Sequence, residues 1–177
     1  MHAVAGDDQS VYRVLNQAPL FWNTTLGALQ AATFMVLGRI FDQGSPHNID
    51  RVLGIAQRNP EIFSRAALGA RRQGRSDTPP EWLDEYIRGV YEPTPQDFRR
   101  LRAYVHKRRK IYEANYRDLR HKVFAHKAMT DQAAVSALFA KTNIRELQRL
   151  FAFLNSLYDA LWQLYFNGNR PVLRPRR

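Results

Sequence analysis

The sequence of 177 residues contains no cysteine. This absence excludes disulfide bonds, thiolate zinc sites, iron–sulfur clusters and cysteine nucleophiles. Nine glycines and nine prolines are ordinary for this length, and no internal repeat or low-complexity tract interrupts the chain. With 45% apolar residues, the chain is long enough to bury the core of one compact domain.

The first ten residues lack the basic start and apolar run of a secretory signal, which predicts a cytoplasmic protein. The most apolar stretch, residues 20–41, still carries Asn23, Gln30 and Arg39, whereas a membrane span needs about 20 predominantly apolar residues. We therefore expect no membrane segment. We interpret this stretch as a buried helix, at the centre of a bundle or in a subunit interface, where its small residues allow close helix approach.

Strand signals are also scarce, because no segment alternates apolar and polar residues for long, and the sequence predicts an all-α fold. After a short amphipathic entry before Pro19, start and stop signals place helices at about 20–43, 48–57, 59–74, 78 to beyond 86, 95–127 and 143–168. Capping boxes are expected at Thr78 and Thr94. Gly44 and Gly168 are expected to end their helices, Gly44 in the left-handed conformation.

The charge is strongly positive, with 27 Lys and Arg against 16 Asp and Glu and a formal charge of +11. This balance favours an anionic partner such as nucleic acid or an acidic surface. Residues 95–127 hold most of the excess, and two interpretations stay open: a solvated helix face, or a surface that binds phosphates. Tyr104, Tyr112 and Tyr116 either stack on bases or pack in the core.

The apolar stripe of this basic helix runs from Phe98 to Val123 in steps of three and four, and three residues later it reaches His126. A histidine beside an arginine can exchange protons while the arginine binds a phosphate. On one regular helix Arg120 and His126 lie about 120° apart and about 9 Å along the axis. One phosphate can therefore contact both residues only if the long arginine side chain extends toward the histidine, or if a second copy of the helix across a two-fold axis supplies one of the two residues. The alternative to a catalytic role for His126 is a purely structural one.

Residues 116–127 read Tyr-Arg-Asp-Leu-Arg-His-Lys-Val-Phe-Ala-His-Lys. This segment resembles the signature of HEPN domains (higher eukaryotes and prokaryotes nucleotide-binding), an arginine and a histidine separated by about four to six residues. It is most similar to the abortive-infection U-type branch. Residues 21–23, 37–42 and 45–49 are similar to the first helices of that branch, and the resemblance extends from about Phe21 to Phe166.

The resemblance implies an HEPN-like helical bundle built on long antiparallel helices, with short helices inserted between them. We expect residues 1–170 to form this single domain and residues 171–177 to form a basic C-terminal tail. The family resemblance further implies a metal-independent endoribonuclease without a cofactor, which acts as a toxin or phage-defence effector. Its partners would be RNA, a second copy of the chain with the site at the interface, and an antitoxin or a nucleotidyltransferase.

In that picture Arg120 would hold the scissile phosphate, and His126 would act on the ribose 2′-hydroxyl or on the leaving oxygen, which yields a 2′,3′-cyclic phosphate. His121 stands where the family often has a polar residue such as Asn, and it would share proton transfer or orient the phosphate. The candidate substrate-binding residues are Lys122, Lys127, Arg117 and Tyr116.

A noncatalytic HEPN-type module that binds RNA or a partner protein is the alternative, although the presence of both Arg120 and His126 favours the enzyme. A basic DNA-binding protein has less support, because no helix-turn-helix pair with an obvious recognition helix is present. Arg39 and Asp42, three residues apart in the helix at 20–43, are expected to form an intrahelical pair.

Overall fold

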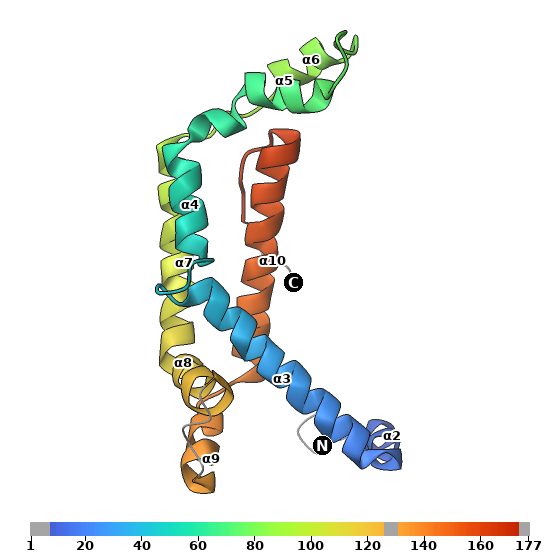
Figure 1. The fold of residues 1–177 in the computed structure, drawn as a ribbon, viewed down its shortest axis with the longest axis vertical. Helices are drawn as coiled ribbons and strands as arrows, with labels where there is room; N and C mark the ends of the chain where they lie inside the picture. Colours follow the sequence, from blue (N-terminus) through green and yellow to red (C-terminus); the bar gives the residue numbers. More distant parts are fainter. Residues whose placement is uncertain (1–7, 126–130, 174–177) are drawn as a thin grey trace.

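The computed structural model describes residues 8–125 and 131–173, and every regular element within these ranges is helical, which confirms the all-α prediction (Figure 1). In chain order the elements are α2 (Gln9–Gln17), α3 (Pro19–Phe41), α4 (Ile49–Arg58), the 3₁₀-helix η1 (Pro60–Phe63), α5 (Arg65–Gln73), α6 (Leu83–Arg88), α7 (Pro95–Asn115), α8 (Arg117–Leu119), the π-helix η2 (Arg120–Ala125), α9 (Gln132–Ala140) and α10 (Ile144–Asn167).

Three helices form the body of the molecule: α4 lies along α7, and α10 runs beside them (Figure 1). The pair α5 and α6 lies at one end of this body, and α8, η2 and α9 lie at the other. Helix α3 crosses the body near the second end and then extends away from it, with α2 at its far tip. The fold thus has a packed body and a projecting helical arm.

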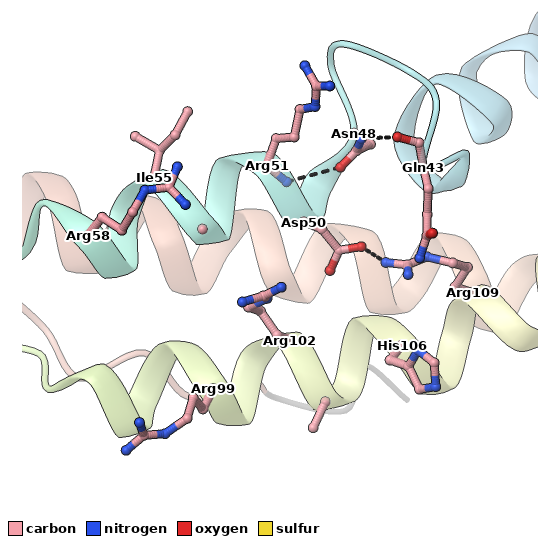
Figure 2. A pocket seen from close by; sticks show the side chains of 12 residues that line it. Gln43, Asn48, Asp50, Arg51, Ile55, Arg58, Arg99, Arg102, His106 and Arg109 are labelled. Carbon is pink, nitrogen blue, oxygen red and sulfur yellow. Dashed lines mark hydrogen bonds and ion pairs between the residues drawn. The ribbon is translucent and has the colours of Figure 1, made fainter.

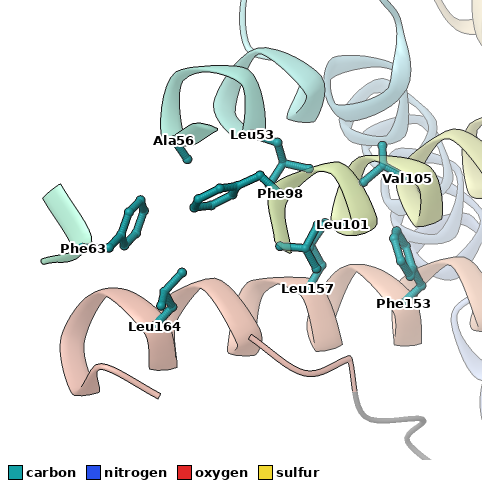
Figure 3. Close-up of a cluster of buried hydrophobic side chains, with 9 residues drawn as sticks. All are labelled: Leu53, Ala56, Phe63, Phe98, Leu101, Val105, Phe153, Leu157 and Leu164. Atoms are coloured by element: carbon teal, nitrogen blue, oxygen red, sulfur yellow. The ribbon is translucent and has the colours of Figure 1, made fainter. Parts of the chain in front are cut away.

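One apolar core fills the space between α4, α7 and α10 (Figure 3). It is centred on Phe98 and Val105 of α7, both fully buried, which meet Leu53 of α4 and Leu157 of α10. Apolar residues repeat every three or four positions on each of these helices, so each turns one stripe inward. Phe63 of η1 closes the core at the end that bears α5, where its ring lies 5.5 Å from that of Phe98.

A second core holds the last turns of α3 against α7, α8 and α10, and it positions the candidate site. Phe41 stacks on Tyr112 with ring centroids 5.6 Å apart, and Phe34 stacks on Tyr116 at 6.0 Å. Offset aromatic pairs of this kind add about 0.5–1.5 kcal/mol beyond the area that they bury. The end of α3 is therefore fixed firmly to the junction of α7 and α8.

The rest of α3 does not lie at the centre of the bundle, contrary to our interpretation. Only Phe34, Leu37, Gly38 and Phe41 are buried, whereas Leu20 is 81% exposed. The first half of the helix projects from the body, and there α2 lies against it at the tip (Figure 1). The helix has the length and mean hydropathy (1.2) of a membrane-crossing segment, and 22% of its most apolar window is buried. The other half of our interpretation, a subunit interface, stays a prediction.

Several predicted helix ends are confirmed. Asn48 caps α4 by accepting a hydrogen bond from the Arg51 N–H at 3.0 Å, and Asn143 caps α10 in the same way. Thr94 and Asp97 form the expected reciprocal cap of α7, with the Thr94 N–H donating to the Asp97 carboxylate at 2.9 Å. Gly168 ends α10 at φ 62°, the left-handed conformation that glycine adopts without strain.

Other boundaries are wrong. Helix α3 ends at Phe41, and Gly44 is not among the described glycines with positive φ. The helix expected from Thr78 begins at Leu83 and has no side-chain cap. The segment 59–74 is divided at Ser64, whose hydroxyl caps α5 by accepting from the Ala67 N–H at 3.1 Å. Helix α9 was not expected at all.

The predicted helix at 95–127 is also interrupted. Helix α7 ends at Asn115, and Tyr116 leaves the helical conformation at φ −125°, ψ −25°. The short α8 follows, and Arg120 then begins the π-helix η2. Single π turns widen the helical backbone and occur frequently at functional sites. The HEPN-like signature therefore starts in a segment whose geometry departs from a regular α-helix.

Candidate active site

A pocket of about 530 Å³ opens where the end of α3 meets α7, α8 and η2. Met35, Arg39 and Asp42 line it from α3 and its cap. Across the pocket lie Arg117 and the first two residues of η2, Arg120 and His121. The pocket thus gathers three arginines and one histidine with two carboxylates, Asp42 and Glu113, although they come from segments about 80 residues apart in the sequence.

The guanidinium of Arg120 is held by Asp42, through an ion pair and hydrogen bond from Nη1 to Oδ2. The two side chains are 20% and 15% exposed, so water screens this pair only partly. Asp42 is the C-cap of α3, where its backbone turns to an extended conformation and its N–H donates to the Gly38 carbonyl. This geometry corrects the expected Arg39–Asp42 pair: in the described structure Asp42 pairs with Arg120 and His121, and Arg39 is exposed at the pocket rim.

Gly38 leaves the space that Arg120 occupies. A Cβ atom at this position would lie 2.3 Å from Arg120 Nε and 2.6 Å from its Cδ, well inside van der Waals contact. The Arg120 Nε–H is buried against α3, and it has no hydrogen-bond partner among the described residues. Gly38 therefore sets how closely the arginine approaches α3, and any side chain here would push the guanidinium outward.

His121 shares the same carboxylate and arginine. Its Nε2 lies 2.9 Å from Arg120 Nη1 and 3.4 Å from Asp42 Oδ2. Arginine can only donate, so Nε2 accepts this shorter bond when the imidazole is neutral and carries its proton on Nδ1. A proton on Nε2 would instead face the Asp42 carboxylate. The imidazole thus lies directly beside the guanidinium, next to the position of a phosphate bound by Arg120, which suits a group that moves a proton.

Tyr112 lies behind this cluster and is fully buried. Burial, with the nearby negative charge of Asp42 as a second cause, raises the pKa of Tyr112 far above its usual range. The hydroxyl therefore stays protonated at all physiological pH values. Together with Phe41, on which it stacks, Tyr112 forms a rigid wall behind Asp42.

The remaining predicted residues fall into three groups. Arg117 is exposed and lines the pocket, as a substrate-binding residue would. Lys122 is exposed and pairs with Asp118 at 2.9 Å, and the hydrogen bond from Lys122 lowers the pKa of that carboxyl. His126 and Lys127 lie outside the described residues.

Tyr116 is not a substrate-binding residue in this structure. It is 0% exposed, its ring stacks on Phe34, and its hydroxyl donates to the Asn143 carbonyl at 3.0 Å. A base cannot reach a ring in this position, and the residue joins α7–α8 to the start of α10. Of the three tyrosines that were considered for stacking, Tyr112 and Tyr116 pack in the core and only Tyr104 is exposed.

Sequence reasoning missed the roles of Gly38 and Asp42. Both lie in the segment 37–42 that resembles the first helices of the family, and this position was the only available signal. The described residues contain no group of three or more acidic, histidine or cysteine side chains that could hold a metal ion.

Comparison with known proteins gives one finding. A model of the HEPN_AbiU2 family, described as AbiU2, matches residues 3–175, which is nearly the whole chain. No curated protein and no solved structure matches the sequence significantly.

Proposed function

The chain belongs to the HEPN_AbiU2 family, and on this premise we propose that it is a metal-independent endoribonuclease that acts as a cytoplasmic toxin or phage-defence effector. The HEPN family is generally associated with ribonucleases, and this branch with abortive infection. The observation that carries the proposal is the cluster in which Asp42 holds Arg120 and His121 together at the pocket. An antitoxin or a nucleotidyltransferase would be its regulator.

In the proposed reaction the ribose 2′-hydroxyl attacks the adjacent phosphorus, and the bond from phosphorus to the 5′-oxygen of the next nucleotide breaks. The products are a 2′,3′-cyclic phosphate and a 5′-hydroxyl. A base takes the 2′-hydroxyl proton, and an acid returns a proton to the leaving oxygen. Arg120 neutralises the extra negative charge that develops on the phosphate oxygens, and its fixed position avoids reorganisation during the reaction.

Two histidines are available for the proton transfers. His126 is the first candidate by resemblance, and His121 the second. The placement of His121 supports this second role, because its Nε2 lies 2.9 Å from Arg120 Nη1 and thus next to the guanidinium that would bind the phosphate. Arg117 and Lys122, with Lys127, would bind neighbouring phosphates.

The proposed test measures the cleavage of end-labelled RNA in the presence of a chelator. We expect cleavage with 2′,3′-cyclic phosphate ends, and at least a hundredfold slower cleavage for Arg120→Ala and for His126→Ala, because each removes a group that acts on the transition state. Arg100→Ala, on an exposed face of α7, serves as the control and keeps the parental rate.

Equal rates for the parent and the two site variants would refute the catalytic assignment. RNA that is bound in a salt-dependent manner but never cut would favour the noncatalytic RNA-binding module.

We also propose a homodimer, because α3 exposes an apolar face. Leu29 (59% exposed) and Val36 (48%) lie two turns apart on this face, and Phe21 (60%) lies near its edge toward the tip. Burial of one such side chain is worth about 1.5–3 kcal/mol, so an arm of this composition gains stability from a partner. Met35, on the same helix, also lines the site pocket, which supports an interface next to the proposed active site.

Light scattering tests this interface. We expect a dimer for the parent protein and a monomer for the double variant Leu29→Glu/Val36→Glu, since two carboxylates cannot be buried without partners. Thr24→Glu/Gln30→Glu adds the same charge at exposed polar positions of α3 and should stay dimeric. A monomeric parent protein, or a parent protein that floats with lipid vesicles through α3, would contradict the proposal.

A further inference from the structure

A second and larger pocket, which the proposed function has not used, lies between α4 and α7 (Figure 2). This α4–α7 groove has a volume of about 960 Å³. Five arginines line it: Arg51, Arg58, Arg99, Arg102 and Arg109. Asp50 is the one carboxylate on its walls, so the groove carries a clear positive excess in the described structure.

The arginines stand on both walls of the groove. Arg99, Arg102 and Arg109 recur at steps of three and seven on one face of α7, and Arg51 and Arg58 are two turns apart on α4 (Figure 2). At 1.5 Å per residue, the row on α7 extends for about 15 Å. Gly54, which has no side chain, and Ala103, which has only a methyl group, leave space between the helices. The site is therefore elongated and matches a chain of negative charges better than a single compact anion.

Arg109 lies on the groove wall with one of its donors unpaired in the described part of the chain. It is 4% exposed and forms an ion pair with Asp50, which fixes its guanidinium on the groove wall (Figure 2). Its Nε–H is nevertheless buried without a hydrogen-bond partner among the described residues. A buried donor that is left unpaired is unfavourable, so the guanidinium of Arg109 has unused hydrogen-bonding capacity.

The α4–α7 groove and the active-site pocket are neighbours. Gln43, in the connection between α3 and α4, lines both. A chain that leaves the Arg120 site past Gln43 would therefore enter the end of the groove near Arg109 and continue toward Arg99. None of the groove's described lining residues is Phe, Tyr or Trp, and His106 is the one ring among them, so its walls offer mainly charge.

We infer that the α4–α7 groove binds the sugar–phosphate backbone of the RNA strand that flanks the cleaved linkage. This inference rests on the proposed function for the identity of the ligand. The guanidinium groups bind successive phosphates without reading the bases, because they act through charge and bidentate hydrogen bonds to phosphate oxygens. The protein accordingly prefers long single strands to short oligonucleotides.

The test compares two triple variants of the full chain. Arg51→Gln/Arg99→Gln/Arg102→Gln removes three exposed charges of the groove. The control Arg100→Gln/Lys107→Gln/Arg149→Gln removes three exposed charges that do not line it, two on another face of α7 and one on α10. Binding is measured at several salt concentrations with 2′-O-methyl RNA, which lacks the attacking hydroxyl and cannot be cut. One probe is a single strand of about 15 nucleotides, within the usual site sizes of such proteins, and the other is a trinucleotide.

The groove variant should bind the long strand at least tenfold more weakly than the parent. The slope of log K against log salt should fall by about 2, since three lost phosphate contacts contribute about 0.7 each. Binding of the trinucleotide, and its cleavage in the unmodified form, should stay within twofold. The control variant should keep the parental slope.

The inference would be overturned if the two variants lost RNA affinity equally, or if the groove variant lost affinity equally for the long and the short RNA. The inference would also be overturned if inorganic tripolyphosphate bound the groove tightly while the groove variant bound the long RNA as well as the parent does. The ligand of the groove would then be a small polyanion. The two proposals fail separately. If RNA is bound through the groove but never cut, only the proposed reaction is wrong, and if RNA is cut equally well by the groove variant, only the groove is wrong.

Discussion

Replacing Gly38 by alanine should separate the position of Arg120 from the stability of the fold. The added Cβ would lie 2.3 Å from Arg120 Nε, 2.6 Å from Cδ and 2.8 Å from Cζ. Ordinary contacts begin near 3.4 Å. Since the crowded atoms belong to a flexible side chain, the guanidinium moves outward by about 1 Å and the helix keeps its place. A displacement of this size from the productive geometry costs up to about a hundredfold in rate.

The same substitution should not weaken the helix. Alanine is about 1 kcal/mol more favourable than glycine inside a helix, and this gain offsets the loss of the Arg120–Asp42 contact. Gly27→Ala provides the matched control, because Gly27 lies in the same helix and its Cβ would meet nothing within 4 Å. Both variants should unfold at or slightly above the parental temperature, and only Gly38→Ala should cleave RNA more slowly, by about 10- to 100-fold.

Two measurements check this reasoning. Cleavage of end-labelled RNA reports the rate, and the NMR signal of the Arg120 Nε–H reports the position of the side chain whether or not the protein cleaves RNA. The signal is observable because this N–H is buried from water. A Gly38→Ala protein with an unchanged Arg120 signal would refute the argument, as would a loss of stability that Gly27→Ala does not show.

Two further variants test two carboxylates, Asp42 at the site and Asp97 in the first turn of α7. Asp42→Asn removes the anion that holds Arg120 and His121. We therefore expect cleavage to slow at least tenfold, while the affinity for RNA stays the same or increases. An affinity for RNA that falls in parallel with the cleavage rate would contradict this. Burial alone would raise the pKa of Asp97, but hydrogen bonds from Thr94 and Tyr91 outweigh it, so the pKa is lowered. The stability that this carboxylate contributes is therefore complete above its unfolded pKa of about 3.9 and is lost as the pH falls through the folded value. Asp97→Asn should lower the melting temperature at pH 7 and reduce its decline in acid, and parallel pH curves for the two proteins would contradict the assignment.

The features that could be predicted from the sequence depend on neighbouring residues. The caps at Asn48, Thr94 and Asn143 need only residues two or three positions away, and the glycine at 168 ends its helix through its own backbone freedom. The stripe from Phe98 onward identified the core face of α7 for the same reason, since helical periodicity is local.

The features that could not be predicted depend on tertiary contacts. The helix beyond Asn115 breaks at Tyr116, whose ring and hydroxyl are held by α3 and the start of α10. Asp42 and Arg120 are 78 positions apart, and only the folded chain brings them together. The expected Arg39–Asp42 pair required α3 to continue past Phe41, but the helix ends there and the carboxylate turns away from its surface.

Helix α3 joins the proposed dimer surface to the arginine cluster. Met35 is exposed beside Val36 and also lines the pocket, and Asp42 follows about 10 Å further along the chain direction. A second copy that covers the exposed face of α3 would therefore form one wall of the pocket directly. Loss of the dimer should open this pocket to water and leave Arg120 on Asp42, whereas Gly38→Ala should displace Arg120 and leave the dimer intact. The Arg120 Nε–H signal consequently distinguishes the two causes of lost activity, because only the second moves it.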